Sequence, residues 1–214
     1  MDPRMLSQDA DRAELLAMGS DVVAMLRSVR EGFVHLDAQP VQTALQAAQG
    51  LHRRERALID RMVRRSSLAL SMPGGREDEA VFLPMHLDRI AGNIELLAVE
   101  VQRALREGVL FTDRATREIR GLLDTVLELL GDLHDALGTG NRTLVRSILD
   151  EGRACETRAN EYALLHEQRL IEGVCQPKAS SIYLAMLDHL RGVEWHAREA
   201  AAKLIPATYA RMPN

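Results

Sequence analysis

Hydrophobic residues recur with a helical period through nearly the whole chain, and the pattern is clearest between residues 83 and 104. Apolar side chains there alternate at steps of four and three: Leu83, Leu87, Ile90, Ile94, Leu97, Val101 and Ala104. A period of 3.5 is typical of helices that pack at a shallow angle in a bundle. Only 3% of the residues are aromatic, which disfavours a β-sandwich or barrel. The sequence therefore predicts an all-α protein.

Short clusters of Gly, Pro and Asn divide this pattern into six long helices. Thr112 and Asn141 are well placed to cap two of the helices. Pro84 lies near the start of another, so we expect the regular part of that helix to begin there. The expected helices span about 8–36, 40–70, 78–107, 113–137, 142–172 and 181–205. Connections this short place consecutive helices antiparallel.

Composition excludes several classes of protein. No apolar run approaches the roughly 20 residues that span a bilayer, so we expect no membrane insertion and a cytoplasmic location. The net charge of −4 argues against a general nucleic-acid binder. The two cysteines, Cys155 and Cys175, are too few for a disulfide framework and indicate reduced structural thiols.

The chain divides into two similar halves, residues 1–108 and 109–214. A shift of 100 residues lays Leu87-Asp88-Arg89-Ile90-Ala91-Gly92 on Leu187-Asp188-His189-Leu190-Arg191-Gly192. The apolar phase, the shared Asp and Gly and the helix breaks all match under this shift. We therefore expect a duplicated three-helix unit, with one copy in each half.

These two segments resemble the PhoU family of phosphate-uptake regulators, which are tandem three-helix bundles. The stretch from Leu165 to Gly173 and the segment Ser180–Leu184 also look like the family's sequence before its last helix. The resemblance implies two PhoU-like repeats and a non-enzymatic regulator of phosphate uptake or signalling. It implies docking to a phosphate transporter or a sensor kinase as partner, and it is compatible with a homodimer.

The resemblance also implies a metal site, because family members hold surface metal clusters with two acids four residues apart. Asp88 and Asp188 match the first acid of each motif, and Gly92 and Gly192 stand where the second acid is expected. Glu95 shares a helix face with Asp88, but about 10.5 Å further along the axis. Asp88 and Asp188 are thus the candidate ligands for a divalent metal or iron, and no other cofactor is expected. Further acids that could contribute are Glu55, Asp60, Glu156 and Glu161.

Two further features suggest a partner-binding surface. Arginines crowd the second expected helix, and Arg53, Arg54, Arg61, Arg64 and Arg65 are candidate contacts for an acidic or phosphorylated partner. The alternative is a solvated helix face. Trp195 lies on the line of Asp188 and Gly192, where it could anchor a partner helix or simply cover the edge of the bundle.

Two other functions stay open. A generic helical scaffold would share the fold without the phosphate link. A carboxylate-bridged metal enzyme would need Glu-x-x-His on two helices, and no acid in this chain has His three residues later. The sequence also lacks HExxH, Walker A and GxSxG motifs, so we expect no enzymatic activity.

Overall fold

A computed structural model describes the backbone of residues 3–70 and 79–204, and the side chains of residues 9–64 and 81–204. The described residues form six long helices: α1 (Pro3–His35), α2 (Ala38–Leu70), α3 (Leu83–Arg106), α4 (Asp113–Thr139), α5 (Arg142–Ile171) and α6 (Pro177–Ala202). A short 3₁₀ turn, η1 (Glu79–Phe82), precedes α3. No strand is present in these segments, so the prediction of an all-α fold is confirmed.

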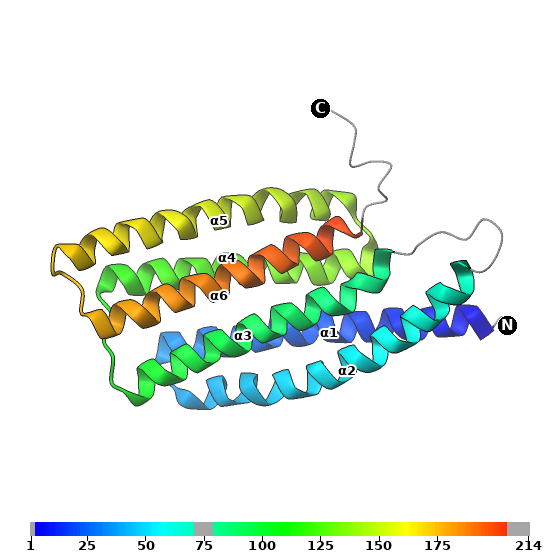
Figure 1. Cartoon of the computed structure of the whole chain (residues 1–214), viewed down its shortest axis with the longest axis horizontal. Helices are drawn as coiled ribbons and strands as arrows, with labels where there is room; N and C mark the ends of the chain where they lie inside the picture. The colour runs from blue at the N-terminus through cyan, green and yellow to red at the C-terminus, as the bar shows by residue number, and fades with distance from the viewer. Residues whose placement is uncertain (1–2, 71–78, 205–214) are drawn as a thin grey trace.

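The helices lie side by side along the long axis of the molecule (Figure 1). α1, α2 and α3 pack on one another, as do α4, α5 and α6, and the two sets meet where α3 packs on α6 and α1 on α4. In Figure 1, α2 and α5 lie at the outer edges. The buried side chains form one continuous core, and the predicted division at residue 108 falls in the linker between α3 and α4.

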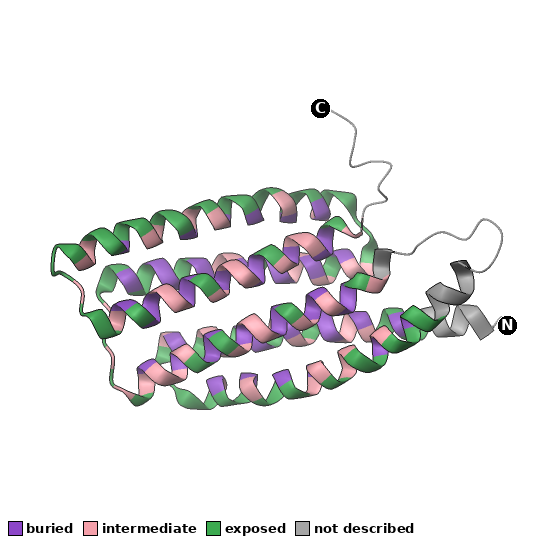
Figure 2. Ribbon diagram, viewed as in Figure 1, coloured by how far each residue is buried: buried purple, intermediate pink, exposed green. Residues whose placement is uncertain are grey.

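The apolar seam predicted for residues 83–104 is buried in full, and it faces α6 and the other helices of the core. Figure 2 shows the same arrangement throughout the bundle, with buried stripes on the facing sides of the helices and α5 exposed along its outer side. Each helix buries one face because none is apolar all round. None of the described helices combines the length and hydrophobicity that a membrane span requires.

Local signals account for the helix ends. Thr112 accepts a hydrogen bond from the backbone N–H of Ala115, and Asn141 accepts one from Thr143, so both predicted caps are confirmed. Gly140 ends α4 in the left-handed conformation, at φ +65°.

Some expected helix starts differ from the structure. α1 begins at Pro3 rather than near Gln8. The 3₁₀ turn η1 occupies the residues before Leu83, so the regular part of α3 begins next to Pro84, as the sequence predicts. α6 begins at Pro177, four residues earlier than expected, since Pro suits the first turn of a helix.

Candidate functional site

The first candidate surface joins α2 to α3 around Asp88. His52 of α2 places Nδ1 2.5 Å from Asp88 Oδ1 and Nε2 3.3 Å from Glu95 Oε2. The two carboxylates therefore hold one imidazole from both sides. Sequence reasoning missed His52 because it lies on another helix, 36 residues before Asp88.

The charges on this surface act on one another. Burial lowers the pKa of His52, but the hydrogen bonds to Asp88 and Glu95 outweigh burial and raise it overall. An imidazolium that donates from both nitrogens fits this geometry. Burial, and then the charge of Asp88, raise the pKa of the neighbouring Glu55. The surface is therefore a half-buried polar cluster in which both carboxylates already have a hydrogen-bond partner.

The corresponding residue on α6, Asp188, has a different partner. Arg191, one turn further along α6, donates to the carboxylate of Asp188 and also to the side chain of Asn160 on α5. An arginine thus occupies the space between α5 and α6 beside Asp188. A guanidinium is always protonated and cannot act as a metal ligand.

The two glycines at the positions where the family resemblance places a second acid, Gly92 and Gly192, have different surroundings. A Cβ added at Gly92 would meet no atom within 4 Å, so this position is open. A Cβ added at Gly192 would lie 2.6 Å from Asn93 Cγ on α3. Gly192 therefore permits the close approach of α6 to α3, which a longer side chain would hinder.

A buried ion pair lies deeper between α5 and α6. Glu194 is 1% exposed and pairs with Arg198, whose guanidinium also donates to Glu156 Oε2 at 2.8 Å. Burial raises the pKa of Glu194 to about 7, although Arg198 acts in the opposite direction.

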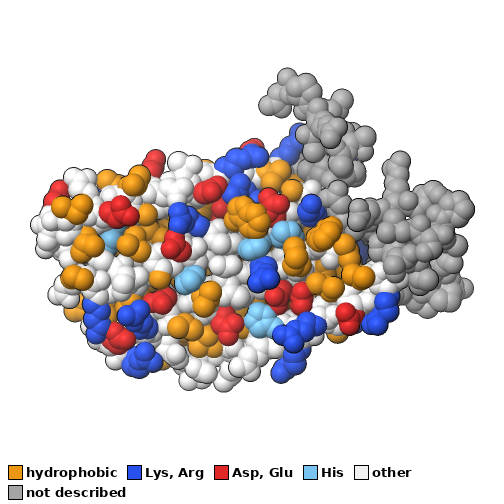
Figure 3. Space-filling model, in the orientation of Figure 1, with side chains coloured by type: hydrophobic (Ala, Val, Ile, Leu, Met, Phe, Trp, Pro, Cys, Tyr) orange, Lys and Arg blue, Asp and Glu red, His pale blue; other side chains and the backbone are white. Residues whose placement is uncertain are grey.

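Trp195 lies at the seam between α3 and α6 and remains 46% exposed. Its ring meets that of His196 edge-on at 4.6 Å between centroids, and His86 of α3 lies 6.4 Å away. His86 and His196 approach each other at 3.2 Å between their Nδ1 atoms. Burial lowers the pKa of His196 to about 4, so the imidazole beside Trp195 is neutral at pH 7. Ring contacts therefore hold the indole while nearly half of its surface faces solvent. Figure 3 shows hydrophobic and histidine side chains next to one another on one face of the molecule.

The arginines of α2 divide into two groups. Arg54 pairs with Asp21 and Glu14 of α1, and Arg61 lies 3.3 Å from Asp11. These two guanidinium groups therefore link α2 to α1. Arg53 and Arg64 are exposed, and Arg64 lies 3.8 Å from Asp60. The side chain of Arg65 lies outside the described residues.

The donor set does not fit a metal cluster. Among the described side chains, no three His, Cys, Asp or Glu residues converge as ligands for one ion. Asp88 is held by His52, Asp188 is held by Arg191, and the two glycines supply no carboxylate. Ligation of a metal by Asp88 and Asp188 stays a prediction, which a direct metal analysis can test.

Comparisons with known proteins show which solved structures share this fold. The sequence matches no family model, and no curated protein matches it. The structure is similar to the crystal structure of PhoU from Pseudomonas aeruginosa, with a TM-score of 0.83, 18% sequence identity, and coverage of 93% of this chain and 95% of that one. It is also similar to the phosphate transport system regulatory protein PhoU from Streptococcus pneumoniae, with a TM-score of 0.73, 12% identity and coverage of 98% of both chains. The chain thus has the PhoU fold that its sequence resemblance predicts.

Proposed function

We propose that this protein regulates phosphate uptake or phosphate signalling by docking to a phosphate transporter or to a sensor kinase. The observation that carries the proposal is the likeness to two PhoU structures over nearly the full length of each chain. One of the two is described as a phosphate transport system regulatory protein. A match over 93% or more of this chain covers the whole architecture rather than one shared motif.

The surface around Trp195 supports docking. A half-exposed indole that neighbouring rings hold in place loses little conformational freedom when a partner covers it. Phe82, 41% exposed, lies at the start of α3, and the Lys203 ammonium is 5.7 Å from the centre of its ring. We infer that these aromatic residues form the centre of the docking surface, with the exposed arginines Arg53 and Arg64 as outlying contacts.

The proposal requires no catalytic step. The Cys155 thiol is a poor nucleophile, because burial raises its pKa to about 12. We also propose that docking proceeds without a bound metal cluster, since a hydrogen bond to His52 engages Asp88 and the Arg191 guanidinium engages Asp188. Metal analysis of protein purified without chelator tests this second point. Stoichiometric iron or zinc that is lost in Asp88→Ala or Asp188→Ala would overturn it.

The regulatory function is tested by deleting the gene in its host and measuring phosphate uptake in ample and in scarce phosphate. We expect uptake, or the expression of the phosphate-uptake genes, to lose its dependence on external phosphate. Restoring the wild-type gene should restore the dependence. Unchanged regulation in the deletion strain would contradict the proposal and would favour a general scaffold with the same fold.

A further inference from the structure

A small cavity lies at the end of the bundle where the α3–α4 linker and the α5–α6 turn meet the start of α4. Its volume is about 180 Å³. Phe111, Ala115, Val174 and Ala179 give it a largely apolar lining, and His166 supplies a polar group. A space of this size holds a molecule of roughly six heavy atoms, since one water occupies about 30 Å³ in the liquid.

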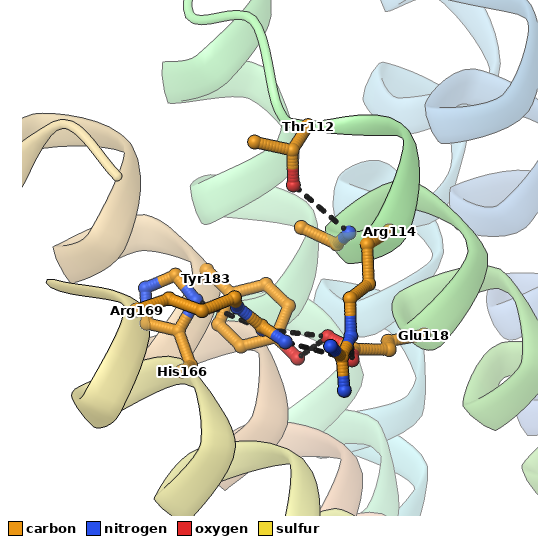
Figure 4. Close-up of polar contacts among 7 residues, drawn as sticks. Thr112, Arg114, Glu118, His166, Arg169 and Tyr183 are labelled. Atoms are coloured by element: carbon orange, nitrogen blue, oxygen red, sulfur yellow. Dashed lines mark hydrogen bonds and ion pairs between the residues drawn. The ribbon is translucent and has the colours of Figure 1, made fainter. Parts of the chain in front are cut away.

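A buried charge network lies beside His166 (Figure 4). Glu118 accepts hydrogen bonds from Arg114 at 2.9 Å, from both terminal nitrogens of Arg169 at 3.1 and 2.9 Å, and from the Tyr183 hydroxyl at 2.5 Å. Burial alone would raise the pKa of Glu118, but these hydrogen bonds lower it overall, so the carboxylate is ionised. Two guanidinium groups face one carboxylate, and the network carries a net positive charge.

His166 is fixed by this network in one tautomer. Its ring stacks on Tyr183 at 4.2 Å between centroids, and Nδ1 lies 3.3 Å from an Arg169 nitrogen. A guanidinium only donates, so Nδ1 accepts and Nε2 carries the hydrogen. The residue is 2% exposed, and Nε2 has no hydrogen-bond partner among the described residues. His166, which lines the cavity, thus carries a buried N–H donor that no group of the described residues satisfies.

Two helix N-termini border the same cavity. Thr112 and Ala115 belong to the start of α4, and Gln176 and Ala179 to the start of α6. Thr112 caps α4, whereas no side chain caps α6. The free N–H groups and the positive ends of two long helix dipoles favour a negative charge at this point.

We propose that the cavity binds a small aliphatic carboxylate, which accepts a hydrogen bond from His166 Nε2 and lays its hydrocarbon part against Phe111 and Val174. The orphan donor, the helix N-termini and the net charge of the network select the anionic group. The apolar lining selects the aliphatic part, and it disfavours a fully polar anion such as inorganic phosphate. The site is independent of the docking surface and goes beyond the regulatory function proposed above.

The proposal is tested with the full chain and butanoate as probe, by calorimetry and by the NMR signal of the His166 Nε2 hydrogen. We expect saturable binding of butanoate that shifts this signal. Butanamide, which has the same shape but no charge, and inorganic phosphate should each bind at least about tenfold more weakly. Equal binding of the three probes, or no saturable binding of butanoate, would overturn the proposal.

Three variants locate the site. His166→Phe keeps a ring on Tyr183 but removes the donor, and Ala179→Leu fills the cavity without changing the network. Each should weaken butanoate binding by about tenfold or more, whereas His35→Phe, at the exposed end of α1, should leave it unchanged. Undiminished binding in Ala179→Leu would overturn the proposal, even if His166→Phe failed to fold.

Discussion

The line Asp88, Gly92 and Glu95 on α3 and the line Asp188, Gly192 and Trp195 on α6 occupy positions 100 residues apart, yet they have different surroundings. On α3 both acids bind His52, and Gly92 faces open space. On α6 the acid binds Arg191, and the Cβ position of Gly192 is blocked by Asn93 of α3.

The comparison shows that Gly92 and Gly192 occupy matching positions but differ in the space that an added side chain would find. At Gly92 the structure leaves room for a carboxylate. At Gly192 an added Cβ would meet the side-chain end of Asn93 on α3, which would have to move. The α3 line is therefore a hydrogen-bonded polar surface, whereas the α6 line presents a half-exposed tryptophan next to a closely packed helix contact.

The largest difference in stability should appear when the buried Glu194–Arg198 pair of α6 is compared with the half-exposed His52–Asp88 contact of α3. Arg198→Ala leaves Glu194 buried without its guanidinium and should reduce the free energy of unfolding by about 3 kcal/mol. His52→Ala breaks a half-exposed cluster and should cost less than about 1 kcal/mol. Urea denaturation measures both values. Equal costs would contradict the view that the Glu194–Arg198 pair of α6 is more deeply buried than the His52 cluster.

Substitution of the two glycines sharpens the comparison further. Gly192→Ala should destabilise the fold by about 2 kcal/mol, because its Cβ meets Asn93. Gly92→Ala should stabilise it by about 0.5 kcal/mol, because alanine favours a helix and the site is open. Thermal unfolding of both variants tests the signs, and Asn93→Ala should relieve much of the cost at Gly192. Destabilisation of the same size in both variants would refute the account.

The open position on α3 also predicts a gain of metal binding. Gly92→Asp adds a carboxylate four residues after Asp88 and three before Glu95, on the face that meets His52. Calorimetric titration with Mn²⁺ or Zn²⁺ should show affinity at least about tenfold above that of the wild type. An unchanged affinity would show that the missing second acid is not what limits metal binding on this surface.

The smallest effect concerns pH. The pKa of His52 is raised above 6.5 in the folded state, so its contribution to stability is present below pH 6.5 and is lost as the pH rises through the raised value. His52→Gln should remove this loss, which amounts to less than about 1 kcal/mol because the cluster is half exposed. Urea denaturation across this pH range measures it. A pH profile identical to that of the wild type would show that His52 does not titrate as described.

The fold could be predicted because its determinants are local. The seam from Leu83 to Ala104, the caps Thr112 and Asn141 and the short connections all act within a few residues of one helix. The start of α6 lies four residues before the expected position, because proline can either end a helix or open one, and Pro177 opens α6.

The surroundings of the candidate residues could not be predicted in the same way. His52 on α2 contacts Asp88 on α3. Asn93 on α3 lies against Gly192 on α6, although the two residues are 99 positions apart in the sequence. Such contacts depend on the rotation of each helix and on the distance between axes, which a hydrophobic period does not specify. Asp88 and Asp188 were identified as a matching pair, but only the structure distinguishes the partners that hold them.

The docking proposal is tested most directly by comparing Trp195→Ala with Glu95→Ala as full-length baits in host cells. The two substitutions lie at matching positions on α6 and α3, and each removes a side chain that is partly exposed. We predict that wild type and Glu95→Ala capture subunits of a phosphate transporter or a sensor kinase, and that Trp195→Ala captures at least about tenfold less. Equal capture by the two variants, or capture of neither class of partner by the wild type, would contradict the account.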